Sequence, residues 1–561
     1  MVTQDFDAIV VGSGVSGGWA AKELTEKGLK TLLIERGRTI TPADYRGEHK
    51  GAWEFPFRQI GDRRRYAADY PIQRLNAMFC EANEQFFVKD SDHPYEQDPN
   101  RPFIWFRGYQ LGGRSLTWGR LTPRWGAINF LENANDGHGV DWPIRYDDIR
   151  PWYDHVEEFI GVAGQTEVNF PTAPVGRYLP PFPLNCCEQH LATAIARKFD
   201  DRRLVIAPVA ILTRPHKGRA ACHYCGPCDR GCSTGSYFSS ISSTLPAAQA
   251  TGRLTTVTNT IVHSLEHDPA THRVTGVRAV NMNTRQRTVF RGRIVFLNAG
   301  TLPTTQVLLN SVSEQYPNGL GNTSGVLGHY LMDHVTGAGA MGVIPGLMDS
   351  RQVGNKPAGM YMPRFRNVAR KDAPFARGFA FQGVTGRSNW TRGMTTPGFG
   401  AGFKEELRSA GPWFALLAGF GECLPRYENR VSLDMNRRDA WDMPLISTSF
   451  DWGENERLMA KHMTADARDI LQAVGAHGVQ ELPNLSPGGM GIHEMGTARM
   501  GRDPRSSYLN GFNQSHELRN LFVTDGACMT SSANQNPSLT YMALTARAAN
   551  HAVDQLKENL L

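Results

Sequence analysis

Four of the nine cysteines in this 561-residue chain lie in one short stretch, "CHYCGPCDRGC", which begins at residue 222. Cys222, Cys225, Cys228 and Cys232 have the spacing C-x2-C-x2-C-x3-C, with which bacterial ferredoxins supply thiolates to an iron–sulfur cluster. Zinc sites usually separate two C-x2-C pairs by a longer gap, and a run of unligated thiols is the remaining interpretation. The spacing therefore predicts an iron–sulfur cluster, and zinc and free thiols stay open as alternatives.

The number of irons depends on the fourth cysteine. In two-cluster ferredoxins the last cysteine of the run ligates the other cluster, and this sequence contains no second run. We expect Cys232 to complete a [4Fe-4S] cluster, in preference to a [3Fe-4S] cluster held by three cysteines. The pair Cys186 and Cys187 in "NCCEQH" could supply a ligand from elsewhere in the chain.

A glycine-rich turn near the N-terminus is typical of dinucleotide binding. The stretch "DAIVVGSGVSGGWAAKELTEKGLKTLLIER" indicates a buried strand, a turn, an amphipathic helix and a second strand. Gly12, Gly14 and Gly17 form G-x-G-x-x-G, which allows a tight turn, close approach of the backbone to a pyrophosphate, and close packing of helix on strand. Glu35 ends the second strand, where a carboxylate binds the ribose hydroxyls and disfavours a 2′-phosphate. The stretch therefore predicts a site for NAD or FAD.

Composition excludes several other classes of protein. Charged residues make up 20% and hydrophobic residues 40% of the chain, as in ordinary globular proteins. The net charge of +6 comes from 60 basic and 54 acidic residues without a long basic block, which argues against nucleic-acid binding. No apolar run approaches the ~20 residues that span a bilayer. Since a structural strand is expected within the first few residues, we expect no signal peptide.

Several separated motifs favour FAD. They are "RGYQLGGRSLTWGRLTPRW" (107–125), "RIVFLNAGTLPTTQVLLNS" (293–311), "GIHEMGTARMG" (491–501) and "NLFVTDGACMTSSANQNPSLTYMALTARAANHAVDQL" (520–556). In this order, and over nearly the whole chain, they resemble the glucose–methanol–choline (GMC) oxidoreductases. Within that family, the chain resembles pyranose oxidase-like sugar oxidoreductases and the catalytic subunit of FAD-dependent glucoside 3-dehydrogenase.

The resemblance implies an α/β fold in two parts. A Rossmann-type FAD-binding domain with a doubly wound sheet would comprise residues 1–49, 101–145, 205–310 and 485–561, including the cysteine run. An antiparallel-sheet substrate-binding domain would comprise residues 50–100, 146–204 and 311–484. The residues expected to contact FAD are Gly12, Ser13, Gly14, Ser16, Gly17, Glu35, Gly113, Ser115, Thr117, Trp118, Gly119, Val262, Ala299, Gly300, Asp525, Gly526, Asn536 and Pro537.

The same resemblance implies an alcohol oxidation with a histidine base. His493 of "GIHEMGTARMG" occupies the base position and Asn536 of "QNPSLT" the partner position. A neutral imidazole is a suitable base near neutral pH, and an amide beside it can hydrogen-bond the substrate oxygen. Candidate sugar-binding side chains between residues 379 and 427 are Gln382, Trp390 and Glu422, with Arg387 and Trp413 nearby.

One departure from the family concerns the attachment of FAD. Pyranose oxidase carries a flavin-linked histidine in the loop that matches "GGRSLTWG", and Thr117 stands at that position here. Threonine cannot form the histidyl–flavin bond, so we expect non-covalent FAD.

These observations predict an FAD- and iron–sulfur-dependent sugar dehydrogenase that oxidises a secondary hydroxyl, at C3 of a glucoside or glucose. An iron–sulfur cluster passes electrons singly, which suits a one-electron acceptor of the cytochrome c type. The alternatives are an oxygen-using pyranose or glycoside 3-oxidase with structural cysteines, and a non-catalytic electron-transfer flavoprotein subunit.

The resemblance also implies a small partner subunit. Because a flavin and a cluster are inserted before export, a folded chain would have to be carried to the periplasm by a partner with a twin-arginine signal. We therefore expect co-export with such a subunit, and a cytoplasmic enzyme if no partner exists.

Overall fold

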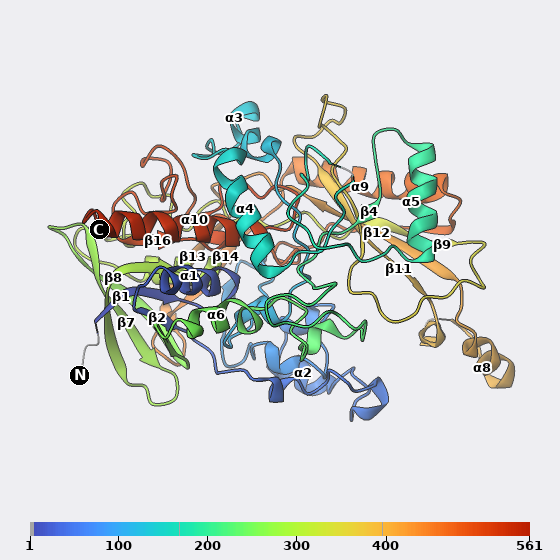
Figure 1. Ribbon diagram of the computed structural model, residues 1–561, viewed down its shortest axis with the longest axis horizontal. Helices are drawn as coiled ribbons and strands as arrows, with labels where there is room; N and C mark the ends of the chain where they lie inside the picture. The colour runs from blue at the N-terminus through green and yellow to red at the C-terminus, as the bar shows by residue number, and fades with distance from the viewer. Residues whose placement is uncertain (1–4, 168, 395) are drawn as a thin grey trace.

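A mostly parallel sheet and an antiparallel sheet lie side by side in this computed structural model, which describes residues 5–167, 169–394 and 396–561 (Figure 1). The first sheet contains the first strand of the chain, and the last helix lies beside it. The second sheet lies toward the opposite end of the long axis, where α9 and α5 contact it. This arrangement confirms the predicted two-part α/β fold.

The mostly parallel sheet has the strand order β5–β2–β1–β8–β7–β6, with β16 also pairing with β8. Strands β5, β2, β1, β8 and β16 pair in parallel, whereas β6, β7 and the first half of β8 form an antiparallel meander. The bounds are β1 Asp5–Val11, β2 Thr31–Ile34, β5 Leu254–Val257, β6 Thr260–Asp268, β7 Arg273–Asn281, β8 Arg287–Leu297 and β16 Leu521–Val523. The continuous apolar run of β1 is explained by its central place, since parallel strands covered on both faces bury nearly every side chain.

Helix α1 packs against strands β1, β2 and β8 of this sheet. Helix α1 contacts α6 and α10, and α10 also contacts α4. The structure places α4 against the FAD-binding part of the fold, although the sequence had grouped residues 146–204 with the substrate-binding part. The helix bounds are α1 Val15–Glu26, α2 Arg63–Asp69, α3 Glu132–Asp136, α4 Tyr146–Ile160, α5 Cys186–Lys198, α6 Thr244–Ala250, α7 Thr301–Leu309, α8 Gly400–Arg408, α9 Glu454–Ala473 and α10 Ser538–Lys557.

The antiparallel sheet has the order β15–β9–β12–β11–β10–β4. Burial alternates strictly along β12, so one face packs on the core and the other faces away from it. Strand β4 belongs to this sheet, although the sequence had assigned residues 205–310 to the FAD-binding domain. The bounds are β4 Val205–Ile206, β9 Ala338–Ile344, β10 Met360–Met362, β11 Phe379–Arg387, β12 Trp413–Gly421 and β15 His477–Pro483; a smaller sheet joins β13 Arg430–Arg438, β14 Pro444–Ser449 and β3 Glu96–Gln97.

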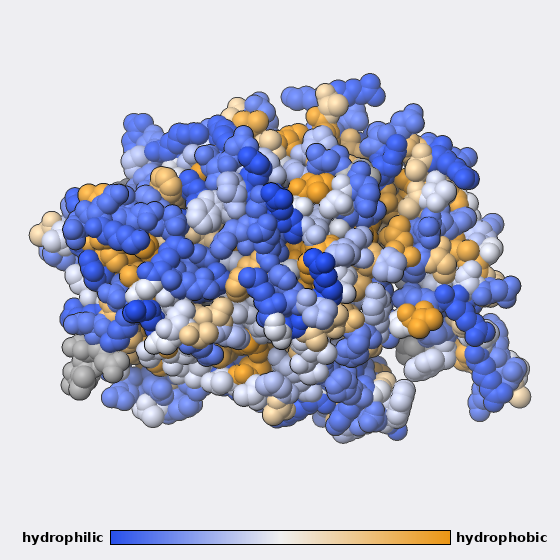
Figure 2. Space-filling view, viewed as in Figure 1, coloured by the Kyte–Doolittle hydropathy of each residue, from blue (hydrophilic) through white to orange (hydrophobic). Residues whose placement is uncertain are grey.

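The face of the molecule in Figure 2 is mainly hydrophilic, with apolar side chains gathered in small patches among the polar ones. Within the described ranges, no helix combines the length and the apolar character that crossing a membrane requires.

Candidate active site

A cavity of about 390 Å³ lies where the two parts of the fold meet. Its walls come from the turn between β1 and α1, the loop 105–121, the turn between β8 and α7, the loop 491–494, and the start of α10. Strands β11 and β12 of the antiparallel sheet close one side with Gln382 and Phe420. The volume is within the range typical of ligand and cofactor sites.

The turn after β1 has the geometry expected of a dinucleotide site. Gly12 adopts φ +92°, a conformation that disfavours any residue with a side chain. A Cβ on Gly17 would lie 1.9 Å from the carbonyl oxygen of Gly12, so this glycine permits α1 to pack on the turn. Glu35 accepts hydrogen bonds from the backbone N–H of Ser13 at 3.1 Å and of Gly37 at 2.8 Å. Burial raises the pKa of its carboxyl group, although these hydrogen bonds oppose the shift.

The space above this turn fits FAD. A Cβ built on Gly14 would meet no heavy atom within 4 Å, although Gly14 lies on the cavity wall at the N-terminus of α1. Val15 and Ser16 in the first turn of α1 also face the cavity. Free backbone N–H groups at a helix N-terminus attract phosphates. These residues would hold the pyrophosphate, and Glu35 would hold the adenosine ribose.

Asp525 links the far end of the cavity to the turn before α7. Its carboxylate accepts hydrogen bonds from the backbone N–H of Gly300 at 2.9 Å, from the Thr304 hydroxyl at 2.5 Å, and from the backbone N–H of Ala527 at 3.0 Å. Burial raises the pKa of Asp525 to about 6, against the opposing effect of these donors. The carboxylate thus fixes two cavity-lining segments relative to each other.

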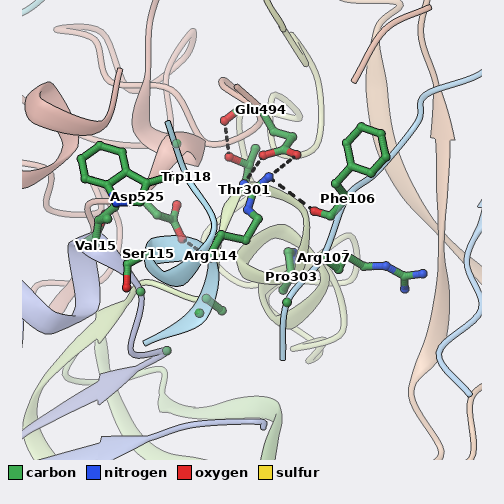
Figure 3. Close-up of a pocket in the computed structure, with 18 of the residues that line it drawn as sticks. Val15, Phe106, Arg107, Arg114, Ser115, Trp118, Thr301, Pro303, Glu494 and Asp525 are labelled. Atoms are coloured by element: carbon green, nitrogen blue, oxygen red, sulfur yellow. Dashed lines mark hydrogen bonds and ion pairs between the residues drawn. The ribbon is translucent and has the colours of Figure 1, made fainter. Parts of the chain in front are cut away.

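An ion pair between Arg114 and Glu494 ties the loop 105–121 to the loop 491–494 (Figure 3). Arg114 Nη1 lies 2.9 Å from Glu494 Oε1. The Glu494 carbonyl also accepts a hydrogen bond from the Thr301 hydroxyl at 2.6 Å. Sequence reasoning missed this pair, because the two residues are 380 positions apart and neither stands out locally.

His493 and Asn536 meet at the cavity wall. His493 Nε2 lies 3.2 Å from Asn536 Nδ2, and Asn536 Oδ1 accepts a hydrogen bond from Gln382 Nε2 at 2.7 Å. Asn536 stands immediately before Pro537 and α10, so the start of that helix positions it. Two residues predicted to act as a pair are therefore brought together, with a side chain of the antiparallel sheet behind them.

Asp333 holds the backbone that carries His493. Its buried carboxylate accepts hydrogen bonds from the N–H groups of Gly489 at 2.8 Å, Gly491 at 2.8 Å and His493 at 3.0 Å. Between the last two donors lies Ile492, a β-branched residue with φ +62°. Such a conformation persists only where surrounding contacts enforce it. Asp333 supplies those contacts on both sides of Ile492.

His334 lies behind His493, away from the cavity. The Nδ1 atoms of the two imidazoles are 2.8 Å apart, and His334 Nε2 is 3.1 Å from the carbonyl oxygen of Ser532. Backbone bridges from Met332 to Met495 and from Val335 to Gly421 hold the stretch that contains His334. Sequence reasoning missed both Asp333 and His334.

Most of the predicted FAD and substrate contacts line this one cavity: Gly12, Ser13, Gly14, Ser16, Glu35, Gly113, Ser115, Thr117, Trp118, Gly119, Val262, Ala299, Gly300, Gln382, His493, Asp525, Gly526, Asn536 and Pro537. Gly17 instead packs against the turn. Trp390 is 64% exposed and lies outside the cavity lining. Glu422 is fully buried in an ion pair with Arg377, so its carboxylate points away from the cavity.

The cysteine run forms a loop against the cavity wall. Arg120 lines the cavity, and its Nη2 donates to the carbonyl oxygen of Cys228 at 2.9 Å. Cys222, Cys225, Cys228 and Cys232 form no disulfide and are partly exposed. Burial raises the pKa of Cys228 to about 11. The other three thiols add to the rise in the pKa of Cys228.

The four thiols do not surround one point. Among the described residues, no group of three or more cysteine, histidine or acidic side chains is arranged to hold a single metal ion. Cys186 and Cys187 begin α5, and Cys187 packs in the core.

Comparison with known proteins shows what this chain is similar to. Family models described as GMC oxidoreductase match residues 208–336 and 425–545. The 2-methyl-1,2-propanediol dehydrogenase of Mycolicibacterium austroafricanum is 27% identical, over 97% of this chain and 94% of that protein. The fructose dehydrogenase large subunit of Gluconobacter japonicus is 25% identical, over 99% of both chains. The solved structure of pyridoxine 4-oxidase from Mesorbium loti has a similar fold, with a TM-score of 0.60 at 17% identity, over 97% of this chain and 98% of that one.

Proposed function

We propose that this chain, whose residues 208–336 and 425–545 match family models described as GMC oxidoreductase, is an FAD- and iron–sulfur-dependent sugar dehydrogenase of that family. The reaction we propose is oxidation of a secondary hydroxyl, at C3 of a glucoside or glucose, to the keto sugar. The observation that carries the proposal is the approach of His493 Nε2 to Asn536 Nδ2 at the wall of the cavity that fits FAD.

The residues at this wall suit removal of a proton from an alcohol. Bound FAD supplies the acceptor for the hydride that leaves the carbinol carbon. His493 Nε2 takes the hydroxyl proton, because a neutral imidazole within hydrogen-bond reach is an efficient base. Asn536 Nδ2 carries two hydrogens. Without substrate, one of them is directed at the lone pair of His493 Nε2. The substrate hydroxyl would replace it there, and Asn536 Nδ2 would then donate to the substrate oxygen, where it favours the developing negative charge.

A sugar is the proposed substrate because of both the site and the relatives. Gln382 places a carboxamide from β11 at the cavity, and Phe420 places a ring from β12 near the base. An amide and an aromatic face suit a pyranose, which presents hydroxyls at its rim and C–H groups on its faces. The similarity to the fructose dehydrogenase large subunit supports the same class of substrate.

The cysteine loop is the proposed site of an iron–sulfur cluster held by Cys222, Cys225, Cys228 and Cys232. Each thiolate of a cluster binds a different iron, so the four sulfurs need not converge on one point as they would around zinc. Hydrogen-bond donors already face the sulfurs, including the backbone N–H of Tyr224 at 3.4 Å from Cys222 Sγ and the Thr234 hydroxyl at 3.2 Å from Cys232 Sγ. Such donors tune the reduction potential of clusters. A cluster here would supply one-electron transfer beside the FAD site.

Non-covalent FAD, a cytochrome c-type acceptor and a small partner subunit complete the proposal. Thr117 at the cavity wall cannot form a histidyl–flavin bond. The similarity to a protein named as a large subunit supports the existence of a partner. Export to the periplasm with that partner is part of the same proposal.

A screen of sugars and simple alcohols, with an artificial electron-accepting dye beside an oxygen electrode, tests the proposal. We expect dye reduction with glucosides and little oxygen uptake. Rapid oxygen uptake would instead identify an oxidase, and FAD that no substrate reduces would identify an electron-transfer subunit. Iron and acid-labile sulfide analysis, together with the visible spectrum before and after dithionite, distinguishes a cluster from zinc.

A further inference from the structure

A chain of hydrogen bonds runs from the backbone to the base. It begins at the carbonyl oxygen of Ser532, passes through both nitrogens of His334 and both nitrogens of His493, and ends at Asn536. The contacts measure 3.1 Å, 2.8 Å and 3.2 Å in that order. A carbonyl oxygen only accepts hydrogen bonds, and unlike a carboxamide it cannot be turned to present a donor.

Both imidazoles are neutral near pH 7. Burial lowers the pKa of His334 to about 4, although the neighbouring backbone carbonyls oppose the shift. Burial, followed by the proximity of His334 and Arg114, lowers the pKa of His493 well below its ordinary value. A neutral imidazole carries one N–H and one lone pair, on different nitrogens. The nitrogen that carries the hydrogen therefore determines which nitrogen of the same ring carries the lone pair.

The carbonyl end then dictates every hydrogen along the chain. His334 must donate from Nε2 to the Ser532 carbonyl, which leaves a lone pair on His334 Nδ1. His493 must donate to that lone pair from its own Nδ1, which leaves a lone pair on His493 Nε2. The opposite assignment would place lone pairs against each other at Ser532 and N–H groups against each other at Asn536. Both of those contacts would be repulsive in a buried site.

We propose that His334 is a positioning residue that keeps the lone pair of His493 on Nε2, the nitrogen that faces the cavity. This inference rests on the proposed function, because it assigns the lone pair that would accept the substrate proton. His334 is absent from the cavity lining among the described residues and acts only through His493. Without it, neutral His493 can place its hydrogen on Nε2 and cannot act as a base in that form.

Two substitutions at this position separate positioning from packing. In His334→Asn, the side-chain oxygen can occupy the place of Nδ1 and accept from His493 Nδ1, so the orientation is retained. In His334→Leu, a side chain of comparable size offers no acceptor. An exposed histidine on β15, His477, provides the matched control His477→Leu.

The first measurement is the rate of FAD reduction by sugar under anaerobic stopped-flow conditions, with substrate affinity taken from its concentration dependence. We expect His334→Leu to lower the rate constant by about 10- to 100-fold, the loss of about one buried hydrogen bond. Substrate affinity should change less than about threefold, and His334→Asn should stay within about threefold of the unsubstituted protein. A His334→Leu protein that reduces FAD at the unsubstituted rate, or a His334→Asn protein as slow as His334→Leu, would overturn the proposal.

The second measurement needs no substrate. Solid-state NMR of the FAD-loaded, ¹⁵N-histidine-labelled protein reports which nitrogen of each neutral imidazole carries the hydrogen, with His493→Gln used for assignment. We expect His493 to be protonated on Nδ1 and His334 on Nε2. Hydrogen on His493 Nε2 would refute the inference even if the sugar is confirmed. Failure to find any sugar substrate would leave this spectrum unchanged, so the two failures are distinguishable.

Discussion

Replacing Asp333 by asparagine should raise stability at alkaline pH while it slows catalysis. The Asp333 carboxylate is buried and accepts hydrogen bonds from the backbone of the 489–493 loop. Burial raises its pKa from 3.8 to about 7, and nearby Glu494 adds to the shift. The substitution removes a costly buried charge and also removes an acceptor that holds His493 in place.

The size of the stability effect follows from proton linkage. Because the pKa of Asp333 is higher in the folded state, the folded protein keeps a proton that the unfolded chain has lost between about pH 4 and pH 7. Stability of the unsubstituted protein therefore falls as pH rises through this window. A shift of about 3 units corresponds to about 4 kcal/mol at ~1.4 kcal/mol per unit. About 3 kcal/mol of this loss falls between pH 5 and pH 8.

Asparagine has no proton to lose, so Asp333→Asn lacks this fall in stability. For a chain of this length the difference corresponds to about 2–3 °C in Tm, at an unfolding entropy of ~2 cal/mol/K per residue. The groups that face Asp333 are Glu494 with its partner Arg114, and the two histidines His334 and His493. All of them are present in both proteins, so their own titration largely cancels in the comparison.

Catalysis at pH 8, where the Asp333 carboxyl group has lost its proton, should respond in the opposite sense. An asparagine side chain has one acceptor oxygen instead of two, so either the N–H of His493 or the N–H groups of both Gly489 and Gly491 lose their partner. Ile492 at φ +62° can then relax toward an ordinary conformation, which releases ~1–3 kcal/mol of strain. Relaxation would displace His493 from Asn536. A displacement of about 1 Å can cost ~100-fold in rate, and we expect FAD reduction to slow by about 10- to 100-fold.

The assay compares Tm of the FAD-loaded protein and of Asp333→Asn at pH 5 and pH 8, with FAD fluorescence as the signal, and measures FAD reduction in parallel. The exposed Asp200 provides the control Asp200→Asn. The reasoning is refuted if Asp333→Asn and the unsubstituted protein show the same change in Tm between the two pH values.

Four further predictions concern the base, the cofactors and the location of the protein. His493→Ala should slow FAD reduction at least ~100-fold with FAD still bound, and Asn536→Ala should slow it less; stopped-flow reduction at a near-unsubstituted rate would remove His493 from its role. Acid precipitation should release FAD into the supernatant because Thr117 cannot anchor it, and a yellow washed pellet would contradict this. Cys228→Ser should lower the iron and sulfide content and the broad visible absorption. An unchanged iron content with a lower zinc content would instead indicate that the cysteines bind zinc. Activity should move to the periplasmic fraction when the chain is expressed with a candidate small subunit, compared with expression alone; activity that stays cytoplasmic in both cases would end the export proposal.

The parts of the fold and site that sequence could predict are those with local constraints. The apolar run of β1, the glycines of the following turn and Glu35 are recognisable because each must satisfy a short-range geometric demand. His493 and Asn536 were identified from motifs, and they meet in the structure at 3.2 Å. Their roles as base and partner remain predictions.

The supporting residues could not be predicted, because their roles depend on contacts with residues far away in the sequence. Asp333 and His334 occur in an unremarkable stretch that reaches His493 only through bridges to segments far along the chain. Glu422 follows a β-strand like many surface carboxylates, and only its contact with Arg377, 45 positions earlier, makes it a buried ion pair. Trp390 suggested a sugar platform by residue type, which carries no information about exposure.

The carbonyl of Ser532 has a consequence for the turnover of protons. It can neither take up nor release a proton, so the hydrogen-bonded chain behind His493 is a closed end and not a relay to solvent. Under the proposed function, the proton that His493 would remove from each sugar would therefore leave on the cavity side, past the position of the keto sugar. The product and the proton released by His493 would then leave the site by the same route. Product that stays bound should consequently delay the loss of the proton from His493. A small buffer molecule should speed turnover only after the product has left.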